Sequence, residues 1–310
     1  MSVVQFAARN ACAAILSIAV LSANGFSADG NAKRFVAFCS TTQVADFVRQ
    51  VGGTHWEVQC VLVPGEDPHL YETTPEDALA AGKADLCFEN GWHLEGGDWM
   101  KTLAKDKGKR LVTCLLGVEP LMVKDGDDER KAYDPHAWFS PRNAVRYVEN
   151  IRTALCEFDS DHADEYNARA DLYRRQLAAL DGWIRQEINK AIPVERRILV
   201  TSHDAFNYFC QAYSFKSASP VGWSTGQEIG GDVTFAKKQA AIDSIRKFGV
   251  KAIFVETSVN KALINEIAKE AGVTVGGELY SDSMGEPGTG GETYIGMMRE
   301  NVLTIVGGLK

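Results

Sequence analysis

A long interval without proline, from Pro141 to Pro193, contains the feature that most constrains this fold. Apolar or aromatic residues recur within it at spacings of four and three, which is the repeat of one buried helix face. These residues are Tyr166, Ala170, Tyr173, Leu177, Leu180 and Ile184. The pattern predicts one continuous helix over residues 159–192, ending before Pro193. Roughly 30 residues at about 1.5 Å each give a rod of about 45 Å, long enough to run along two domains.

Short apolar runs alternate with helical segments on both sides of this helix. The runs before it cover residues 34–40, 58–65, 84–90 and 110–117. The runs after it cover residues 196–202, 250–256 and 273–280, with helical segments at 233–248 and 261–271. Such alternation is typical of a parallel sheet with helices on both faces. The sequence therefore predicts an α/β fold of two Rossmann-like lobes, at 28–158 and 193–310, bridged by the long rigid helix.

Residues 1–27 have the composition of a secretory signal peptide. Arg9 is followed by the apolar run "NACAAILSIAVLSA", and Gly25 and Ser27 are small residues placed for cleavage before Ala28. Cys12 follows "RNA" and does not stand in a lipoprotein-type cleavage box. We therefore expect a soluble periplasmic protein without a covalent membrane anchor.

Charge and cysteine content narrow the class of protein. The chain has 41 acidic and 33 basic residues, a net charge of −8 and no basic tract, which argues against nucleic acid as a partner. No CxxC pair occurs, so a thiolate metal site has no support. Cys60, Cys87 and Cys114 lie in strand-like runs and are predicted to be buried thiols, while disulfide pairing stays open.

Two histidines occur in the same local setting. His69 in "EDPHLYETTP" and His136 in "DPHAWFSP" each belong to an Asp-Pro-His triplet that is followed by a Thr-Pro or Ser-Pro pair. Thr or Ser before Pro is a helix start signal, with the first residue as N-cap and proline at the first helical position. Both histidines are therefore predicted in loops just before helices, and His69 follows the carboxyl end of a strand.

Two further candidates follow strands in the second half. His203 comes after "RRILVTS" and Asp282 after "VTVGGELY". Ligands of open parallel sheets bind beyond the carboxyl ends of the strands, so lobes that face each other would bring all four side chains together. Three imidazoles and a carboxylate suit a divalent transition metal ion. Glu256, at the end of "AIFVE", is a candidate to hold one of these imidazoles by a hydrogen bond.

The remaining histidines have ordinary explanations. His55 and His162 lie in polar turns and are predicted to face solvent. His93, in "NGWHLEGG", lies in a loop on the correct rim of the sheet, but packing or capping explains it better than metal binding.

Four ordered segments carry a resemblance to a known family. They are "GEDPHLYETTPED", "DPHAWFSP", "TSHDAFNYF" and "LYSDSMGEPGTGGETYIGMMRENV". They resemble the signature segments of the TroA-like metal-binding receptors of ABC transporters, and the match covers about residues 33–307. The resemblance implies two α/β lobes bridged by one long helix, with a metal ion held between them by His69, His136, His203 and Asp282.

The same resemblance implies a membrane partner but does not identify which metal ion is bound. The receptor would be a monomer that delivers its ion to an integral membrane permease, with the ATPase as a separate subunit because this chain has no GxxxxGK[ST] motif. Zinc-specialised members carry a His-rich loop where residues 117–133 have no histidine, and manganese-specialised members have Glu where this chain has His203. Zinc and manganese both remain candidates, and ferrous iron is a third.

Two other functions remain as alternatives. An exported zinc-dependent hydrolase would need an open coordination position and a base such as Glu256 or Glu228, but no HExxH motif occurs. A receptor for a chelate, such as haem or a siderophore, would need a wide aromatic cleft instead of four convergent ligands.

For the metal-ion receptor, ordinary imidazole pKa values predict that metal affinity falls below about pH 6. Release of the ion is expected through shifts of Asp282 or His203.

Overall fold

The computed structural model describes residues 34–124, 131–219, 235–258 and 261–310. The predicted signal peptide at 1–27 and the candidate base Glu228 lie outside the described residues. Residues 34–310 form one compact unit. Among the described helices, each one is too short or too polar to cross a membrane.

The N-terminal half contains a four-stranded parallel sheet with the order β2-β1-β3-β4. Its strands are β1 Phe35–Cys39, β2 Trp56–Cys60, β3 Leu86–Glu89 and β4 Leu111–Thr113. Alternate residues of each strand face opposite sides of the sheet. Ala37 and Cys39 therefore pack into one apolar core, whereas Phe38 packs into another. The four predicted strands are confirmed, although each is shorter than its apolar run.

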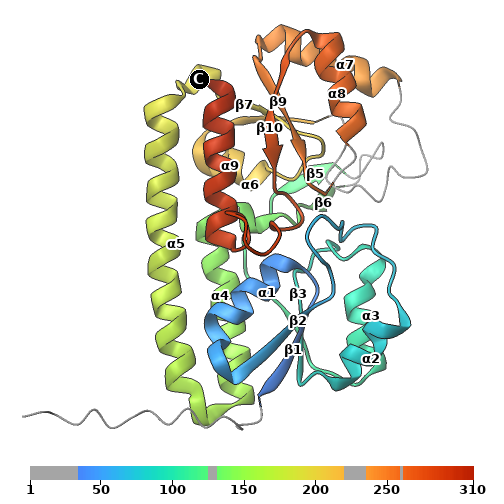
Figure 1. The fold of residues 1–310 in the computed structure, drawn as a ribbon, viewed down its shortest axis with the longest axis vertical. Helices are drawn as coiled ribbons and strands as arrows, with labels where there is room; N and C mark the ends of the chain where they lie inside the picture. The colour runs from blue at the N-terminus through green and yellow to red at the C-terminus, as the bar shows by residue number, and fades with distance from the viewer. Residues whose placement is uncertain (1–33, 125–130, 220–234, 259–260) are drawn as a thin grey trace, which may run out of the picture. The chain divides into compact units, whose positions relative to one another are not determined.

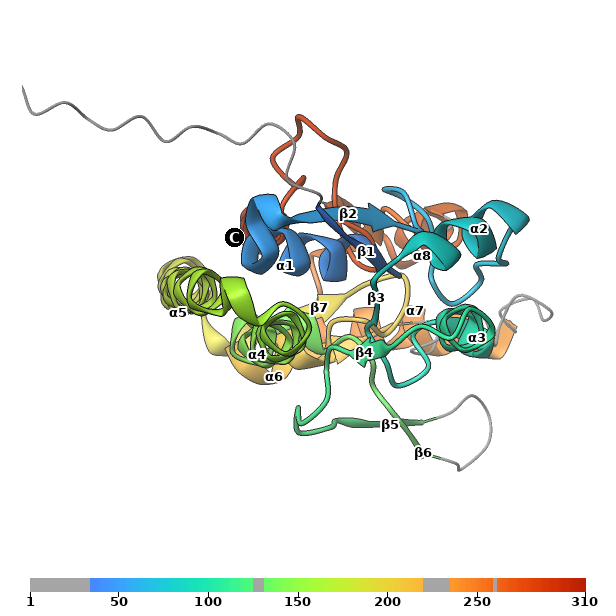
Figure 2. The same cartoon turned by 90° about the horizontal axis from the view of Figure 1, so that it is seen from below.

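Helices cover both faces of this sheet (Figure 2). They are α1 Thr42–Gly52 and α4 Pro141–Phe158 on one face, and α2 Pro75–Lys83 and α3 Trp99–Asp106 on the other. The helix starts follow the predicted signals, because Thr74 and Asp77 form a reciprocal capping box with Pro75 at the first position of α2. Pro141 opens α4 as predicted, but the Ser140 side chain before it makes no capping hydrogen bond.

The predicted long helix is α5 Ala163–Ala191, which has 29 residues. A short 3₁₀ turn, Ser160–His162, precedes it, so the helix begins four residues later than predicted. All six residues of the predicted stripe are buried. The helix packs on α1 and α4 of the first half and on α9 Tyr294–Leu309 of the second half (Figure 1). One apolar core runs through both halves along this helix.

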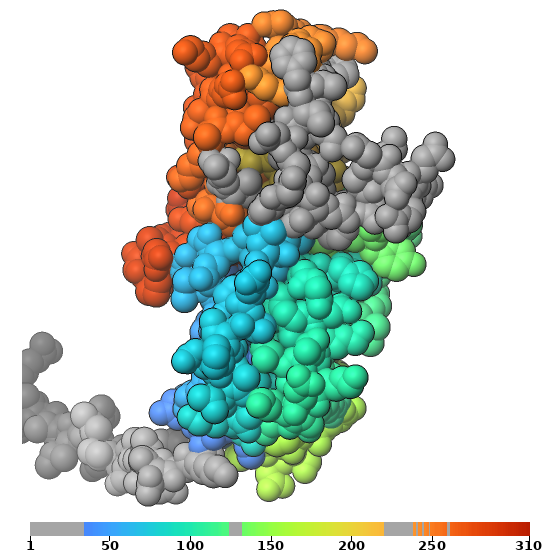
Figure 3. Space-filling model, turned by 90° about the vertical axis from the view of Figure 1, so that its right-hand side faces the viewer, coloured from blue at the N-terminus to red at the C-terminus, as the bar shows by residue number. Residues whose placement is uncertain are grey.

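The C-terminal half is built from two parallel strand pairs. The strands are β7 Ile198–Val200 with β8 Lys216–Ala218, and β9 Ala252–Glu256 with β10 Thr274–Leu279. The helices are α6 Asn207–Tyr213, α7 Phe235–Phe248, α8 Lys261–Ala271 and α9. Figure 3 shows this half lying directly against the N-terminal half. The structure therefore has the predicted α/β architecture, while the lobe boundaries at 158 and 193 stay a prediction.

Some details differ from the predictions. Part of segment 117–133 forms an antiparallel pair, β5 Met122–Lys124 with β6 Lys131–Tyr133, and residues 125–130 between them are not described. The six cysteines of the described chain are free thiols. Cys87 and Cys114 are buried as predicted, whereas Cys60 is partly exposed.

Candidate metal centre

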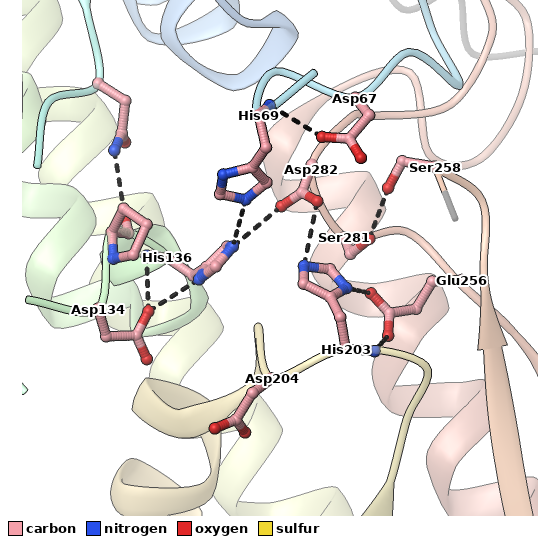
Figure 4. A network of polar contacts seen from close by, with 12 residues as sticks. Asp67, His69, Asp134, His136, His203, Asp204, Glu256, Ser258, Ser281 and Asp282 are labelled. Atoms are coloured by element: carbon pink, nitrogen blue, oxygen red, sulfur yellow. Dashed lines mark hydrogen bonds and ion pairs between the residues drawn. The ribbon is translucent and has the colours of Figure 1, made fainter. Parts of the chain in front are cut away.

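The structure brings the four predicted residues together. His69 lies in the loop after β2, His136 immediately precedes the 3₁₀ turn before α4, His203 follows β7 and Asp282 follows β10. One potential ligand atom from each lies within 4.8 Å of all the others, and the four side chains are buried. Figure 4 shows them pointing toward one another from different loops.

Three of the separations between these atoms match the coordination shell of a small cation. The His69 and His136 Nε2 atoms are 3.3 Å apart, and Asp282 lies 3.2 Å from His136 and 3.1 Å from His203. Tetrahedral ligands at about 2.0–2.1 Å from an ion are separated by roughly 3.3 Å. The two oxygens of Asp282 face different imidazoles, so both can approach the same ion.

Two buried carboxylates orient two of the imidazoles. Asp134 Oδ1 lies 2.8 Å from His136 Nδ1 and also accepts the His136 backbone N–H. Glu256 Oε2 lies 2.6 Å from His203 Nδ1, while its Oε1 accepts the His203 backbone N–H. A carboxylate on Nδ1 leaves Nε2 directed at the ion and makes it a better donor. Glu256 thus has the contact expected from the sequence.

The contact of Asp134 with the His136 ring was not predicted from the sequence. The repeated Asp-Pro-His triplet was the available signal. In the first triplet Asp67 accepts the backbone N–H of His69, at 2.9 Å. In the second triplet the same local geometry also brings the Asp134 carboxylate to the ring of His136.

Burial and close charges set the protonation of the centre. Burial lowers the pKa of His69 to about 3, despite the nearby Asp282 carboxylate. Burial also opposes the charged form of His136, but hydrogen bonds to Asp134 and Asp282 outweigh it and raise its pKa to about 9. Burial also opposes the charged forms of His203 and Asp282, but Glu256 and Asp282 raise the pKa of His203, and His203 and His136 lower the pKa of Asp282. A divalent ion would therefore replace protons on His136 and His203.

The loop that carries Asp282 is bonded to the N-terminal half of the chain. The Gln43 side chain donates to the Ser281 carbonyl at 3.0 Å, and the Met284 N–H donates to Thr42 Oγ1 at 2.8 Å. The Gly65 N–H donates to Ser283 Oγ at 2.8 Å. Asp282 therefore follows a C-terminal strand but is held by residues of the first half.

The other three histidines lie outside this centre. His93 is exposed, and its Nδ1 lies 3.2 Å from Asp98. The prediction that His55 and His162 simply face solvent is wrong, because their rings stack with centroids 3.9 Å apart and both are partly buried. The turn at 53–55 packs against the start of α5, a tertiary contact that local sequence does not reveal.

Comparisons with known proteins identify relatives that are named for metal binding or metal uptake. A family model described as "Zinc-uptake complex component A periplasmic" matches residues 38–308. The manganese-binding lipoprotein MntA of Bacillus subtilis is 38% identical over 87% of this chain and 88% of its own length. The iron-binding protein YfeA of Yersinia pestis is 35% identical over 96% of this chain and 93% of its own length.

A solved structure shows the same fold. The periplasmic zinc-binding protein TroA of Treponema pallidum superposes with a TM-score of 0.82 at 30% identity, covering 89% of this chain and 99% of TroA. The family match spans nearly all of the described residues and includes all four residues of the centre. The chain therefore belongs to the family of periplasmic zinc-uptake components, which are metal-transport receptors and not enzymes.

Proposed function

We propose that this protein is the extracytoplasmic substrate-binding component of an ABC importer. It captures one divalent transition metal ion with His69, His136, His203 and Asp282 and delivers it to a membrane permease powered by a separate ATPase subunit. The observation that carries the proposal is the convergence of these four buried side chains from four separate loops. Asp134 and Glu256 orient two of the imidazoles.

The geometry favours a receptor over the two alternatives. A hydrolase needs a base that is available to activate water, but both oxygens of Glu256 are engaged by His203. A chelate receptor needs room for a macrocycle or a siderophore, whereas the four donor atoms lie within 4.8 Å of one another. A bare ion with four protein donors fits this space, and such a closed shell suits capture and transfer.

The donor set is compatible with both zinc and manganese. Separations of 3.1–3.3 Å suit tetrahedral zinc, and three imidazoles favour it. Because both Asp282 oxygens face the centre, a bidentate carboxylate would add a fifth donor and admit the higher coordination that manganese or ferrous iron takes. We infer that zinc binds more tightly than manganese in vitro, in line with the general affinity order of these ions.

Substitution of the donors, one at a time, tests the proposal. The wild-type protein should bind one zinc ion per chain, measured by elemental analysis, with affinity measured by chelator competition. Replacing His69 or His136 with Ala should lower affinity by about a hundredfold or more, because a donor is lost from a buried shell. His162→Ala is the matched control and should leave binding unchanged. Unchanged stoichiometry and affinity in His69→Ala would show that the site assignment is wrong.

The membrane attachment is a separate proposal. Several relatives are named lipoproteins, including MntA of Bacillus subtilis. We infer that this chain is instead cleaved before Ala28, because Cys12 does not stand in a lipoprotein-type cleavage box. Mass spectrometry of the exported protein should find Ala28 at its N-terminus. A lipid-modified Cys12 at that terminus would contradict the inference.

A further inference from the structure

One buried carboxylate near the metal centre touches none of the four proposed donors. Glu95 is 2% exposed and lies in the segment between β3 and α3. Its Oε1 accepts the Ser40 hydroxyl at 2.6 Å and the Asn90 N–H at 2.7 Å, and its Oε2 accepts the Gly91 N–H at 3.2 Å. Burial, together with the negative charge of Glu89, raises the pKa of Glu95 to about 7.

The segment that Glu95 closes is held in an uncommon backbone conformation. Trp92, His93 and Asp98 have φ values of 50°, 61° and 55°, in the left-handed region that non-glycine residues rarely adopt. Such conformations persist where the surroundings determine them, and they cluster at functional sites. By accepting hydrogen bonds from the Asn90 and Gly91 amides, Glu95 joins the middle of the Asn90–Trp99 loop to its beginning.

The same loop binds both Asp-Pro-His turns. The Asn90 side chain donates to the Pro135 carbonyl at 3.0 Å, and the Gly96 N–H donates to the Pro68 carbonyl at 3.2 Å. The Trp99 indole donates to the Pro68 carbonyl as well, at 3.1 Å. Pro68 and Pro135 directly precede His69 and His136, so the loop holds the backbone just before each imidazole.

The fit between the loop and the first turn is close. A Cβ added to Gly96 would lie 2.0 Å from the His69 carbonyl oxygen, so only glycine allows this approach without a shift. On the other side, the Tyr147 hydroxyl donates to Asn90 Oδ1 at 2.7 Å, which fixes the orientation of the Asn90 amide toward Pro135. The loop thus sets the distance between two turns that lie far apart in the sequence.

We propose that Glu95 is a positioning residue that holds the Asn90–Trp99 loop so that His69 and His136 are correctly spaced before the ion arrives. The inference rests on the proposed metal-receptor function. Glu95 acts through backbone and amide contacts and does not itself bind the ion. A preformed spacing favours binding because the loops need not be ordered by the ion.

Glu95→Gln tests the inference, because the amide cannot accept hydrogen bonds at both of its terminal atoms. We expect zinc affinity to fall by about tenfold, as for other residues that support metal ligands, with a larger loss in Glu95→Ala. The absorption spectrum of bound Co²⁺ should also change in band position or intensity, because it reports ligand geometry. A residue that only stabilises the fold would not alter this spectrum.

Asp159→Asn is the matched control. Asp159 is also a buried carboxylate that accepts hydrogen bonds, and it lies beside the start of α5, away from the centre. This variant should lower Tm without changing zinc affinity or the Co²⁺ spectrum. Wild-type affinity and spectrum in a folded Glu95→Gln protein would overturn the inference.

A second variant decides the question if Glu95→Gln does not fold. Asn90→Ala removes the donor to the Pro135 carbonyl and leaves the Glu95 carboxylate in place. It should weaken zinc binding by several-fold and change the Co²⁺ spectrum, and unchanged values would overturn the inference. If the wild-type protein bound no zinc, the proposed function itself would fail. If His69→Ala lost zinc binding but Glu95→Gln and Asn90→Ala kept it, the proposed function would stand and only the positioning role of the loop would be wrong.

Discussion

Histidines make ring contacts with one another in two places, and the two groups differ in burial and in what their ring nitrogens face. One group is His69, His136 and His203 of the metal centre, and the other is His55 with His162. His69 and His136 lie in the buried metal centre with their Nε2 atoms 3.3 Å apart. His55 and His162 stack more closely, but each ring is partly exposed. In this second pair a nitrogen of each ring is engaged by its own carboxylate, Glu165 or Asp159.

The comparison shows that close imidazoles do not by themselves make a metal site. In the centre, carboxylates occupy the Nδ1 atoms of His136 and His203, so that their Nε2 atoms face the shared Asp282. In the stacked pair the carboxylates point to different nitrogens and no common point is formed. The direction of the nitrogens and the exclusion of water decide which group can capture an ion.

Stabilisation by zinc should give the largest difference between the two groups. A ligand at a thousandfold excess over its Kd stabilises the folded state by about 4 kcal/mol, which raises Tm by several degrees. His203→Ala should remove most of this rise because it removes a donor, whereas His55→Ala should keep it. Thermal unfolding with and without zinc measures the effect. If zinc raised the Tm of His203→Ala as much as that of the wild-type protein, His203 would not be a zinc donor.

Loss of the carboxylates behind the imidazoles should have a smaller effect. Asp134→Asn and Glu256→Gln weaken the contact that orients His136 or His203, so zinc affinity should fall by about 10- to 100-fold. Asp159→Asn breaks the equivalent contact of His162 and should leave zinc affinity unchanged. Chelator competition on the three variants measures this. Equal affinities in all three would mean that the carboxylates at the centre do not support binding.

The pH dependence of binding sharpens the contrast further. In the metal-free centre, His136 has a pKa of about 9 and is therefore protonated at pH 7, and the Glu256 and Asp282 carboxylates raise the pKa of His203 against the effect of its burial. Zinc must displace the proton of His136, and affinity should therefore fall by at least about tenfold per pH unit as pH decreases from 8 to 6. The loss of zinc affinity should therefore begin well above the pH of about 6 that ordinary imidazole pKa values predict.

The folding stability of the metal-free protein should depend on pH in the opposite direction. The stabilising contribution of protonated His136 is complete below pH 6.5 and is lost as pH rises through 9.

Calorimetric titration in buffers of different ionisation enthalpy counts the displaced protons directly. Release of at least one proton per zinc ion at pH 7 is the expected result. Zinc binding without proton release would show that the two imidazoles are neutral before the ion arrives. The stacked pair makes no contribution to this count, so His162→Ala should release the same number of protons as the wild-type protein.

The sequence predicted the parts of this molecule that depend on local patterns. Apolar runs identified the strands, and His203 and Asp282 could be placed at a common rim because they directly follow such runs. The stripe from Tyr166 to Ile184 predicted the long helix because every member of it is buried against neighbouring elements.

The parts that were missed depend on tertiary contacts. The β5–β6 pair has strands of only three residues, too short for a periodic pattern. Glu95 gave no signal because its partners are two backbone amides of its own loop and the Ser40 hydroxyl, which is distant in the sequence. The His55–His162 contact joins a turn after α1 to the start of α5, and local composition describes both segments simply as polar turns.

The smallest predicted effect concerns the acid stability of the stacked pair. Burial would raise the pKa of Asp159, but hydrogen bonds from Tyr166 and His162 outweigh it and lower that pKa. Its stabilising contribution is therefore present above its ordinary value of 3.8 and is lost as pH falls through the lowered value. His162→Ala should reduce the free energy of unfolding at pH 7 by less than about 1 kcal/mol, because the ring is partly exposed to solvent. Denaturant unfolding at pH 7 and pH 3 should show this difference shrinking with acid. A larger loss at pH 3 than at pH 7 would mean that the contact with Asp159 is not what stabilises this turn.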